Sequence, residues 1–189
     1  MVYWKDMKKF FENIIFKNDE NYIVKGDVVD LRFRYSTTEK TAYDGVATCY
    51  YDILEHKTSL KVGSIDLRLT MNEDMYYYGH IGYNILQKYR GHNYAYYACL
   101  LVFKEAKEKH HMNELIITCN PDNTPSYKIL KKLGGELIEV IQVPKDHELY
   151  RLGDKFKCIF RYKIDLWYGK NRKYRRNNIW IKTRDNHYS

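Results

Sequence analysis

The strongest helical pattern in this 189-residue chain spans residues 94–109. One face of the predicted helix repeats small and apolar residues at helical spacing, namely Ala95, Ala98, Cys99, Val102, Phe103 and Ala106. A short apolar run at 115–119 follows, as is typical of a strand buried on both faces. Because a strand is also predicted at 76–86, a right-handed crossover would place the two strands parallel. This strand–helix–strand unit leaves few folds open.

The rest of the chain also divides into predicted strands and helices. Strands are predicted at 28–35, 42–54, 60–70, 136–143 and 155–164, and a helical stripe covers 3–16. A second helix begins at Thr124-Pro125, where Thr can cap the helix and Pro has no N–H to satisfy, and it ends at Gly134-Gly135. This order predicts an α+β fold with a mixed, twisted sheet of about seven strands and helices on both faces.

Charge is concentrated near the C-terminus. Residues 168–184 hold seven of the basic side chains and no acid, and subtracting these seven from the net charge of +8 leaves +1 elsewhere. Such a stretch can bind nucleic acid, because Arg interleaved with aromatic residues suits single-stranded RNA. We favour packing against the domain or a second copy of the chain, since Ile179, Trp180 and Ile181 interrupt the charges and would bury apolar area.

Other composition features exclude several protein classes. No apolar run approaches the roughly 18 residues of a membrane helix, and the first residues lack a signal-peptide pattern. The four cysteines are widely spaced, without Cys-x-x-Cys, and are interpreted as reduced thiols. We therefore expect a cytoplasmic protein that does not bind a membrane and has no metal site.

The segment between the predicted strand at 76–86 and the strong helix carries a candidate anion site. A turn containing Gly91 leads into the N-terminus of the helix, where free backbone N–H groups and the positive end of the helix dipole can bind a pyrophosphate. An ordinary strand-to-helix turn is the alternative interpretation of the same residues.

The chain between residues 61 and 166 resembles the GNAT superfamily of acyl-CoA-dependent N-acyltransferases. Residues 90–95, Arg-Gly-His-Asn-Tyr-Ala, match its [Arg/Gln]-x-x-Gly-x-[Gly/Ala] signature, with Asn93 at the first glycine position. Asn tolerates left-handed backbone better than most residues, which would preserve the turn. Residues 79–83 match the family's fourth strand, and 123–126 with 132–135 match its Asn-x-x-[Ser/Ala] helix and glycine stop.

The resemblance implies a splayed pair of central strands that bind acetyl-CoA as co-substrate. The pantetheine arm would pair with backbone groups of Tyr83, Asn84, Ile85 and Leu86. The pyrophosphate would bind the loop formed by Arg90, Gly91, His92, Asn93, Tyr94 and Ala95. Asn123 and Ser126 would contact CoA or support the loop, or would simply cap the second helix. The expected organisation is one acyltransferase domain at 1–166 and a basic aromatic extension at 167–189.

His80 is the candidate general base, because it stands where many relatives carry a glutamate and its unperturbed pKa suits the task. Alternatively, it is satisfied within the sheet or stacked among Tyr76, Tyr77 and Tyr78. The family's tyrosine acid is replaced by Leu130.

Several further residues are weaker candidates for the acceptor side and for catalysis. Tyr127 is a poor substitute for the missing acid, because it lies about 80° round the helix at ~100° per residue. Asp66 and Arg68, with Tyr78, would line the acceptor groove, unless the pair is only a solvated one. Cys119 would be a core thiol rather than a covalent nucleophile.

The predicted function is transfer of an acetyl group from acetyl-CoA to a primary amine of an unidentified acceptor, by a protein that can form a homodimer. One alternative is a CoA-binding sensor without catalysis. Another is an RNA- or ribosome-associated protein that uses the basic extension.

Overall fold

The computed structural model describes residues 22–42 and 45–164. The helix predicted at 3–16 and the basic extension at 167–189 lie outside the described residues.

Five strands form one antiparallel sheet in the order β1-β2-β3-β4-β5. These strands are β1 (Ile23–Val24), β2 (Val29–Thr37), β3 (Thr48–Glu55), β4 (Lys61–Arg68) and β5 (Ile81–Ile85). The register aligns one inward-facing row across four of them, with Phe33 opposite Tyr51, Tyr51 opposite Ile65, and Ile65 opposite Tyr83. Side chains alternate along a strand, so Asp66 and Arg68 of β4 lie on the opposite face from Ile65 and Leu67.

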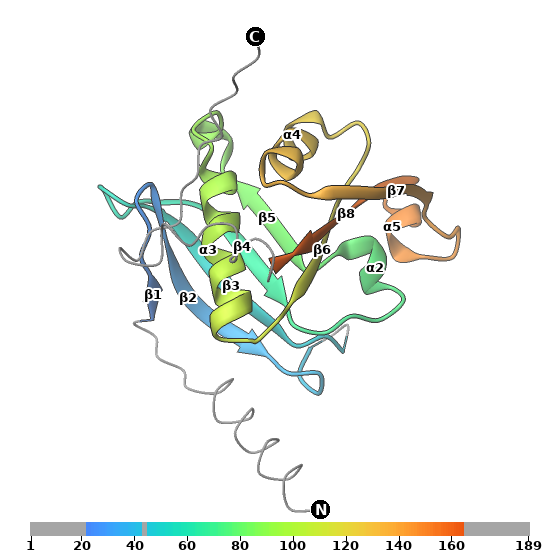
Figure 1. Ribbon diagram of the computed structural model, residues 1–189, viewed down its shortest axis with the longest axis horizontal. Helices are drawn as coiled ribbons and strands as arrows, with labels where there is room; N and C mark the ends of the chain where they lie inside the picture. Colours follow the sequence, from blue (N-terminus) through green and yellow to red (C-terminus); the bar gives the residue numbers. More distant parts are fainter. Residues whose placement is uncertain (1–21, 43–44, 165–189) are drawn as a thin grey trace, which may run out of the picture.

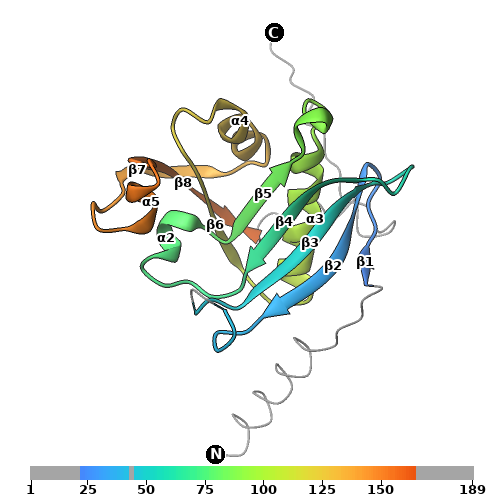
Figure 2. The same cartoon turned by 180° about the vertical axis from the view of Figure 1, so that it is seen from behind.

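Helix α3 (Tyr94–Glu108) packs on the inner face of this sheet (Figure 1). Its predicted apolar face is buried, and Ala98, Cys99, Val102 and Ala106 are fully inaccessible to solvent. Seen from behind, the sheet lies in front of the helix (Figure 2). Burial of this helical face therefore supplies much of the central core, as the periodicity of the sequence predicts.

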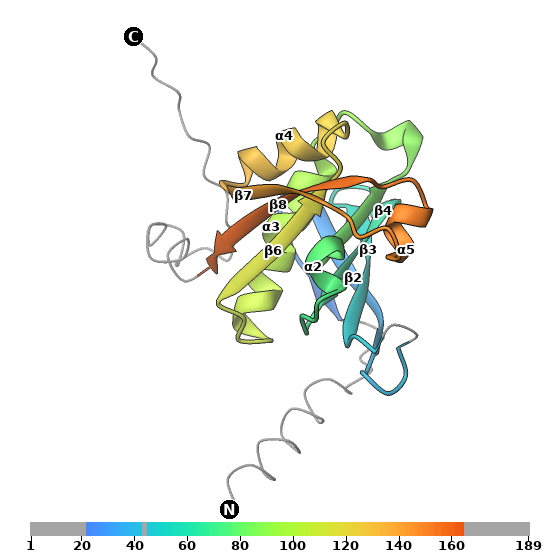
Figure 3. The ribbon, with the colours of Figure 1, turned by 90° about the vertical axis from the view of Figure 1, so that its right-hand side faces the viewer.

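A second antiparallel sheet has three strands in the order β6-β8-β7. They are β6 (Glu114–Cys119), β7 (Glu136–Gln142) and β8 (Phe156–Lys163), and the helices that join them are α4 (Thr124–Lys132) and α5 (Glu148–Arg151). Figure 3 shows α4 beside this sheet. The Tyr162 hydroxyl of β8 donates a 2.8 Å hydrogen bond to the Leu130 carbonyl and so attaches α4 to the sheet.

The two sheets meet between His80, just before β5, and the middle of β6. The backbone N–H of His80 donates to the Ile116 carbonyl at 2.7 Å, and beyond this point β5 and β6 diverge (Figure 1). Gly79 has a φ of +75°, and a Cβ there would lie 3.1 Å from the Ile116 carbonyl oxygen. The α+β class is confirmed, and the expected mixed sheet is divided into two antiparallel sheets at this junction.

The strand predicted at 76–86 is wrong in its first half. Residues 75–78 form a short helix, α2 (Met75–Tyr78), because the Asn72 side chain accepts a hydrogen bond from the Met75 N–H and Gly79 ends the turn with positive φ. The second helix begins one residue earlier than predicted, since Asn123 rather than Thr124 caps α4. The sequence analysis also missed β1, the 3₁₀ turn η1 (Gln87–Tyr89) and α5.

Substitution of Gly79 should destabilise the protein more than substitution of a second glycine with positive φ. Gly134 also has positive φ, but a Cβ there meets no atom within 4 Å. We expect Gly134→Ala to lower the free energy of unfolding by about 1–2 kcal/mol. Gly79→Ala should cost roughly 1–3 kcal/mol more, because its Cβ crowds the β6 backbone. Urea denaturation followed by circular dichroism measures both, and equal losses would show that the junction tolerates a side chain.

Candidate active site

The edge of β5 that faces β6 has no strand partner in the described part of the chain beyond His80, because the two strands diverge there, and we call the region between them the opening. Leu86 N–H donates to the Val62 carbonyl, which makes these two opposite residues a hydrogen-bonded pair of the β4–β5 ladder. Such pairs alternate in an antiparallel ladder, so the backbone groups of Tyr83 and Ile85 point away from β4 and into the opening. The resemblance assigned four residues to this edge. Only Tyr83 and Ile85 direct their backbone groups into the opening, whereas those of Asn84 and Leu86 face β4.

The narrow end of the opening is closed by the His80 side chain. Its Nδ1 accepts a 2.9 Å hydrogen bond from the Ile116 N–H, in addition to the bond that the His80 N–H donates to the Ile116 carbonyl. The imidazole thus takes the place of the main-chain acceptor that a continuing ladder would offer to Ile116. Thr118 Oγ1 of β6 also donates to the Tyr77 carbonyl at 2.9 Å, which fixes the end of α2 at the same point.

The environment of His80 favours the structural interpretation over the general base. The side chain is only 8% exposed, and burial is the main cause that lowers its pKa to about 4. At neutral pH the ring is therefore uncharged, and since Nδ1 accepts a hydrogen bond, its proton is on Nε2. A neutral imidazole with Nδ1 occupied and Nε2 protonated has no free lone pair with which to remove a proton from an ammonium group.

The loop between β5 and α3 forms at the wide end of the opening. Asn93 has φ +58° and ψ 18°, so Asn does adopt the left-handed conformation at the family's glycine position. The first N–H groups of α3, from Tyr94 onward, then lack acceptors within the helix and carry the positive end of its dipole. Lys132 Nζ lies 4.3 Å from the ring centroid of Tyr96 in this first turn. The wide end can therefore bind an anion.

The side chains of the loop between β5 and α3 make contacts with different parts of the protein. Arg90 is exposed, and its Nε donates a 3.2 Å hydrogen bond to the Ile85 carbonyl at the end of β5. The exposed His92 ring stacks on Tyr94 at 5.3 Å, and the Tyr94 hydroxyl donates to Glu55 at 2.6 Å. The loop thus offers an anion its backbone amides, with Arg90 as the nearest guanidinium.

Helix α4 is connected to β5 across the opening. Asn123 Oδ1 accepts from the Ser126 N–H at 3.2 Å, which confirms its capping role, and Ser126 Oγ accepts from the Tyr83 hydroxyl at 3.1 Å. Leu130 is fully buried, so the position of the family's tyrosine acid is occupied by a core side chain that cannot donate a proton. Tyr127 packs its ring against Phe160 of β8 at 5.4 Å, so its ring belongs to the contact between α4 and the second sheet.

The other expected acceptor residues do lie together, beside the narrow end. Arg68 Nη2 is 3.1 Å from Asp66 Oδ2, and the Arg68 guanidinium lies 6.0 Å from the Tyr78 ring centroid. The Tyr78 hydroxyl donates to Glu148 at 2.8 Å, and the Tyr78 ring lies 5.4 Å from that of His147. The sequence analysis did not identify Glu148 or His147 as site residues, because they follow α2 by about seventy positions and belong to no motif.

The remaining candidate chemistry is limited. All four cysteines are free and buried, and burial, the main cause, raises the pKa of Cys119 to about 12, which leaves it an unreactive thiol. Within residues 22–42 and 45–164, no group of His, Cys, Asp or Glu side chains is arranged to hold a metal ion. In the same part of the chain, no helix has the length and apolarity needed to cross a membrane.

Three solved structures share this fold. A GNAT-family acetyltransferase from Bacillus anthracis is 16% identical, with 76% of this chain and 99% of that chain covered and a TM-score of 0.56. A ribosomal-protein-serine acetyltransferase from Vibrio cholerae is 13% identical (76% and 98% covered, TM-score 0.54). The ribosomal L7/L12 α-N-protein acetyltransferase RimL is 12% identical (76% and 98% covered, TM-score 0.53). At these identities the likeness shows the fold alone.

No curated protein matches the chain by sequence. The sequence profile of the acetyltransferase (GNAT) domain matches residues 6–136, which is well over half of the chain and includes the N-terminal part where individual motifs are weak. On this match, and with the divergent strands and the loop before α3 in place, the chain belongs to the GNAT family of acetyltransferases.

Proposed function

We propose that this acyltransferase moves the acetyl group of acetyl-CoA directly to a primary amine at the junction of β5 and β6. The observation that carries the proposal is the continuous path from the first turn of α3, which can bind a pyrophosphate, along the open edge formed by Tyr83 and Ile85. The pantetheine arm would pair with these backbone groups and bring the thioester toward His80. Asn123 and Ser126 would support the path through α4.

The transfer itself needs mainly positioning and polarisation. A backbone N–H at the β5 edge would hydrogen-bond the thioester oxygen as negative charge develops there. The ammonium of the acceptor first releases a proton to water, and the amine nitrogen then bonds to the carbonyl carbon. The nitrogen releases its extra proton to water as the carbon–sulfur bond breaks, and the thiolate of CoA takes a proton from water, because Leu130 offers none.

We propose that His80 is a positioning residue and not the base. Its two hydrogen bonds with Ile116 set the point at which β5 and β6 separate, and hence the width of the opening that would hold the pantetheine arm. The low pKa of His80 supports this role, because the ring stays uncharged and keeps Nδ1 as an acceptor throughout the neutral range.

The acceptor is proposed to be a protein. Two structural neighbours are named as ribosomal-protein acetyltransferases, which supports this proposal. A CoA-binding protein without catalysis is the second candidate, favoured by the buried Leu130 and by the uncharged His80. Packing of 167–189 on a second copy of the chain and RNA binding through 167–189 both concern residues outside the described part. The four free thiols suit the cytoplasmic location that we propose.

Acetyl-CoA should raise the melting temperature of the protein. A ligand that binds only the folded state adds about 2.7 kcal/mol at a hundredfold excess over Kd, or roughly 5–10 °C for a domain of this size. S-acetylpantetheine, which lacks the diphosphate, should give a much smaller shift at the same concentration. Differential scanning fluorimetry and calorimetry measure both. If millimolar acetyl-CoA neither raises the melting temperature nor gives a heat of binding, the proposed acetyl-CoA site is ruled out.

Two substitutions at position 80 separate a positioning residue from a base. His80→Asn keeps an oxygen close to the place of Nδ1, so kcat/KM should stay within about threefold of the wild type with an unchanged pH profile. His80→Ala leaves the buried Ile116 N–H unpaired, a cost of about 1–3 kcal/mol, and should weaken CoA binding. If His80→Asn instead lowers the rate roughly 10²–10⁴-fold and abolishes the pH transition, His80 is the general base after all.

The same variant should change how stability depends on pH. Between about pH 6.5 and pH 4 the unfolded chain protonates His80 while the folded chain does not, so the free energy of unfolding falls as the pH falls through this window. The share of His80 is up to roughly 3 kcal/mol. Burial is also the main cause that lowers the pKa of His110 to about 4, and this residue contributes in both proteins. Urea titrations at each pH should therefore show a shallower slope for His80→Asn. If the free energy of unfolding depends on pH in the same way in both proteins, the low pKa assigned to His80 is wrong.

A further inference from the structure

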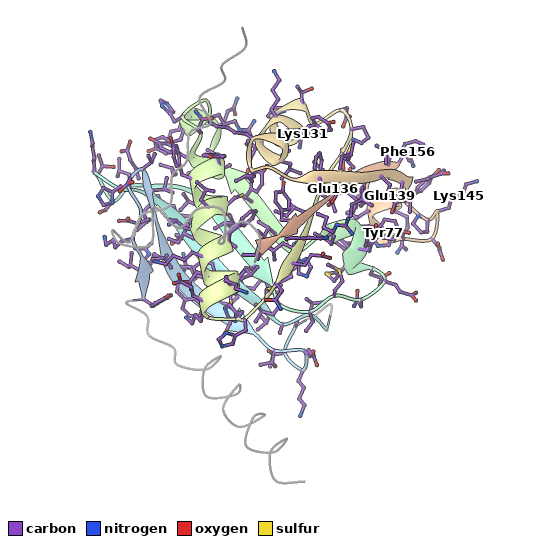
Figure 4. The ribbon with its side chains drawn as sticks, viewed as in Figure 1. Tyr77, Lys131, Glu136, Glu139, Lys145 and Phe156 are labelled. Carbon is purple, nitrogen blue, oxygen red and sulfur yellow. The ribbon has the colours of Figure 1, made fainter. Side chains whose placement is uncertain are left out.

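A group of tyrosines and carboxylates connects α2 to β7 and α5 beside the narrow end of the opening. We call it the tyrosine–carboxylate cluster, and it comprises Tyr76, Tyr77, Tyr78, Glu139, His147 and Glu148. The Tyr76 hydroxyl donates to Glu139 Oε1 at 2.7 Å, and the Tyr78 hydroxyl donates to Glu148 Oε2 at 2.8 Å. Tyr77 and Glu139 lie on the same side of the molecule, near α5 (Figure 4). Each carboxylate can still accept further hydrogen bonds.

One buried donor in this cluster has no partner. His147 is 9% exposed, and its Nδ1 accepts a 3.1 Å hydrogen bond from the Leu149 N–H at the start of α5. The neutral ring therefore carries its proton on Nε2, for which no acceptor among the described residues lies within hydrogen-bond distance. The ring lies against Tyr77 and Tyr78, with centroids 5.1 and 5.4 Å away, and Asp74 Oδ1 is 3.8 Å from Nε2. A buried unpaired donor requires an explanation, and a ligand oxygen supplies one.

The surface around the cluster is acidic in a chain whose net charge is +8. Five exposed carboxylates lie on the segments that form it or adjoin it, at Glu73, Asp74, Glu139, Asp146 and Glu148. The cations of these segments are Lys145 and Arg151, and Arg68 of β4, which is paired with Asp66, lies 6.0 Å from the Tyr78 ring. The Asp74 side chain is 76% exposed, so the surface is open to solvent. Aromatic faces beside carboxylates suit a positively charged group, which gains from both.

The position of the cluster relates it to the proposed reaction. Helix α2 runs directly into Gly79 and His80, and Thr118 of β6 holds the Tyr77 carbonyl. The cluster therefore adjoins the narrow end, opposite the loop that would bind the pyrophosphate. A thioester brought along the β5 edge would approach it, so an acceptor bound at the cluster would meet the acetyl group.

We propose that the tyrosine–carboxylate cluster binds the polypeptide segment next to the acetylated amine. A peptide carbonyl accepts the Nε2–H of His147, and a lysine or arginine side chain of the acceptor lies between the tyrosine rings and Glu148. This inference rests on the proposed acetyl transfer and specifies its substrate as a basic polypeptide.

Two observations favour a polypeptide over a small polyamine. The unpaired donor of His147 calls for a carbonyl oxygen, which a peptide has and an alkyl polyamine lacks. The carboxylates of the cluster are exposed on an open surface, whereas small ligands are generally enclosed in concave sites that bury most of their area.

The test begins with a random pool of hexapeptides with free α-amines, incubated with the full-length protein and acetyl-CoA. Mass spectrometry of the products should show Arg and Lys enriched in the positions after the amine. The most enriched arginine peptide is then compared with the same peptide carrying citrulline, which keeps the shape of arginine without its charge. We expect the arginine peptide to have about fivefold higher kcat/KM, the size of one exposed ion pair with a cation–π contact.

Two variants locate the contacts. His147→Asn keeps a cap for α5, since Asn is a strong capping residue, and removes the Nε2–H together with the ring that packs on Tyr77 and Tyr78. It should raise KM for the peptide about threefold to tenfold and leave KM for spermidine, which has no carbonyl, unaltered. Glu148→Gln should remove the preference for arginine over citrulline. Glu114→Gln, an exposed carboxylate at the start of β6, makes the same charge change elsewhere and should preserve that preference.

The outcomes separate this inference from the proposed function. Acetylation of spermidine but of no peptide overturns the polypeptide acceptor, as does a pool without Arg or Lys enrichment. Equal losses with peptide and spermidine in His147→Asn overturn the carbonyl contact. If calorimetry shows acetyl-CoA bound and no amine is acetylated, the proposed transfer fails instead.

Discussion

The pair of hydrogen bonds between His80 and Ile116 is the constraint on which the candidate site depends. A main-chain pair at this place would continue the ladder from β5 to β6 and leave no gap. The imidazole satisfies the Ile116 N–H from the side, so that Ile116 needs no main-chain acceptor on β5, and the strands diverge beyond this point. Gly79 allows the close approach because it has no Cβ to meet the β6 backbone. The opening thus depends on the buried, uncharged side chain of His80 and on the lack of a side chain at Gly79.

The two ends of the opening differ in chemical character. At the wide end, the left-handed Asn93 starts α3 with free N–H groups, and the cation of Lys132 stands over the first turn. At the narrow end, α2 contributes tyrosine hydroxyls that donate to Glu139 and Glu148. An anionic co-substrate therefore fits one end and a cationic acceptor the other, and this difference in charge orients the two substrates. The reaction that we propose needs little more than this alignment, because the acetyl group is already activated as a thioester.

Much of the fold could be predicted because its signals are local. The apolar face of α3, the capped start of α4 and the alternating strands are patterns of neighbouring residues, and they were placed within a few positions of the observed elements. The loop before α3 was found because its residues are consecutive. The role of His80 could not be read in this way, because its partner Ile116 is 36 positions away and its pKa depends on burial by both sheets. Helix α2 was missed because three consecutive tyrosines favour a strand, and only the Asn72 cap and Gly79 outweigh that preference.

The sequence by itself determined the family, the order of the elements and the loop that begins α3, since each of these follows from residue types at short spacing. Only the tertiary structure decided which backbone groups of β5 face the opening, that His80 joins two sheets, and that His147 and Glu148 stand beside Tyr78. These facts depend on register and on contacts between segments some 36 to 70 residues apart. Such contacts are selected by how the whole core packs, and no local pattern of residues encodes them.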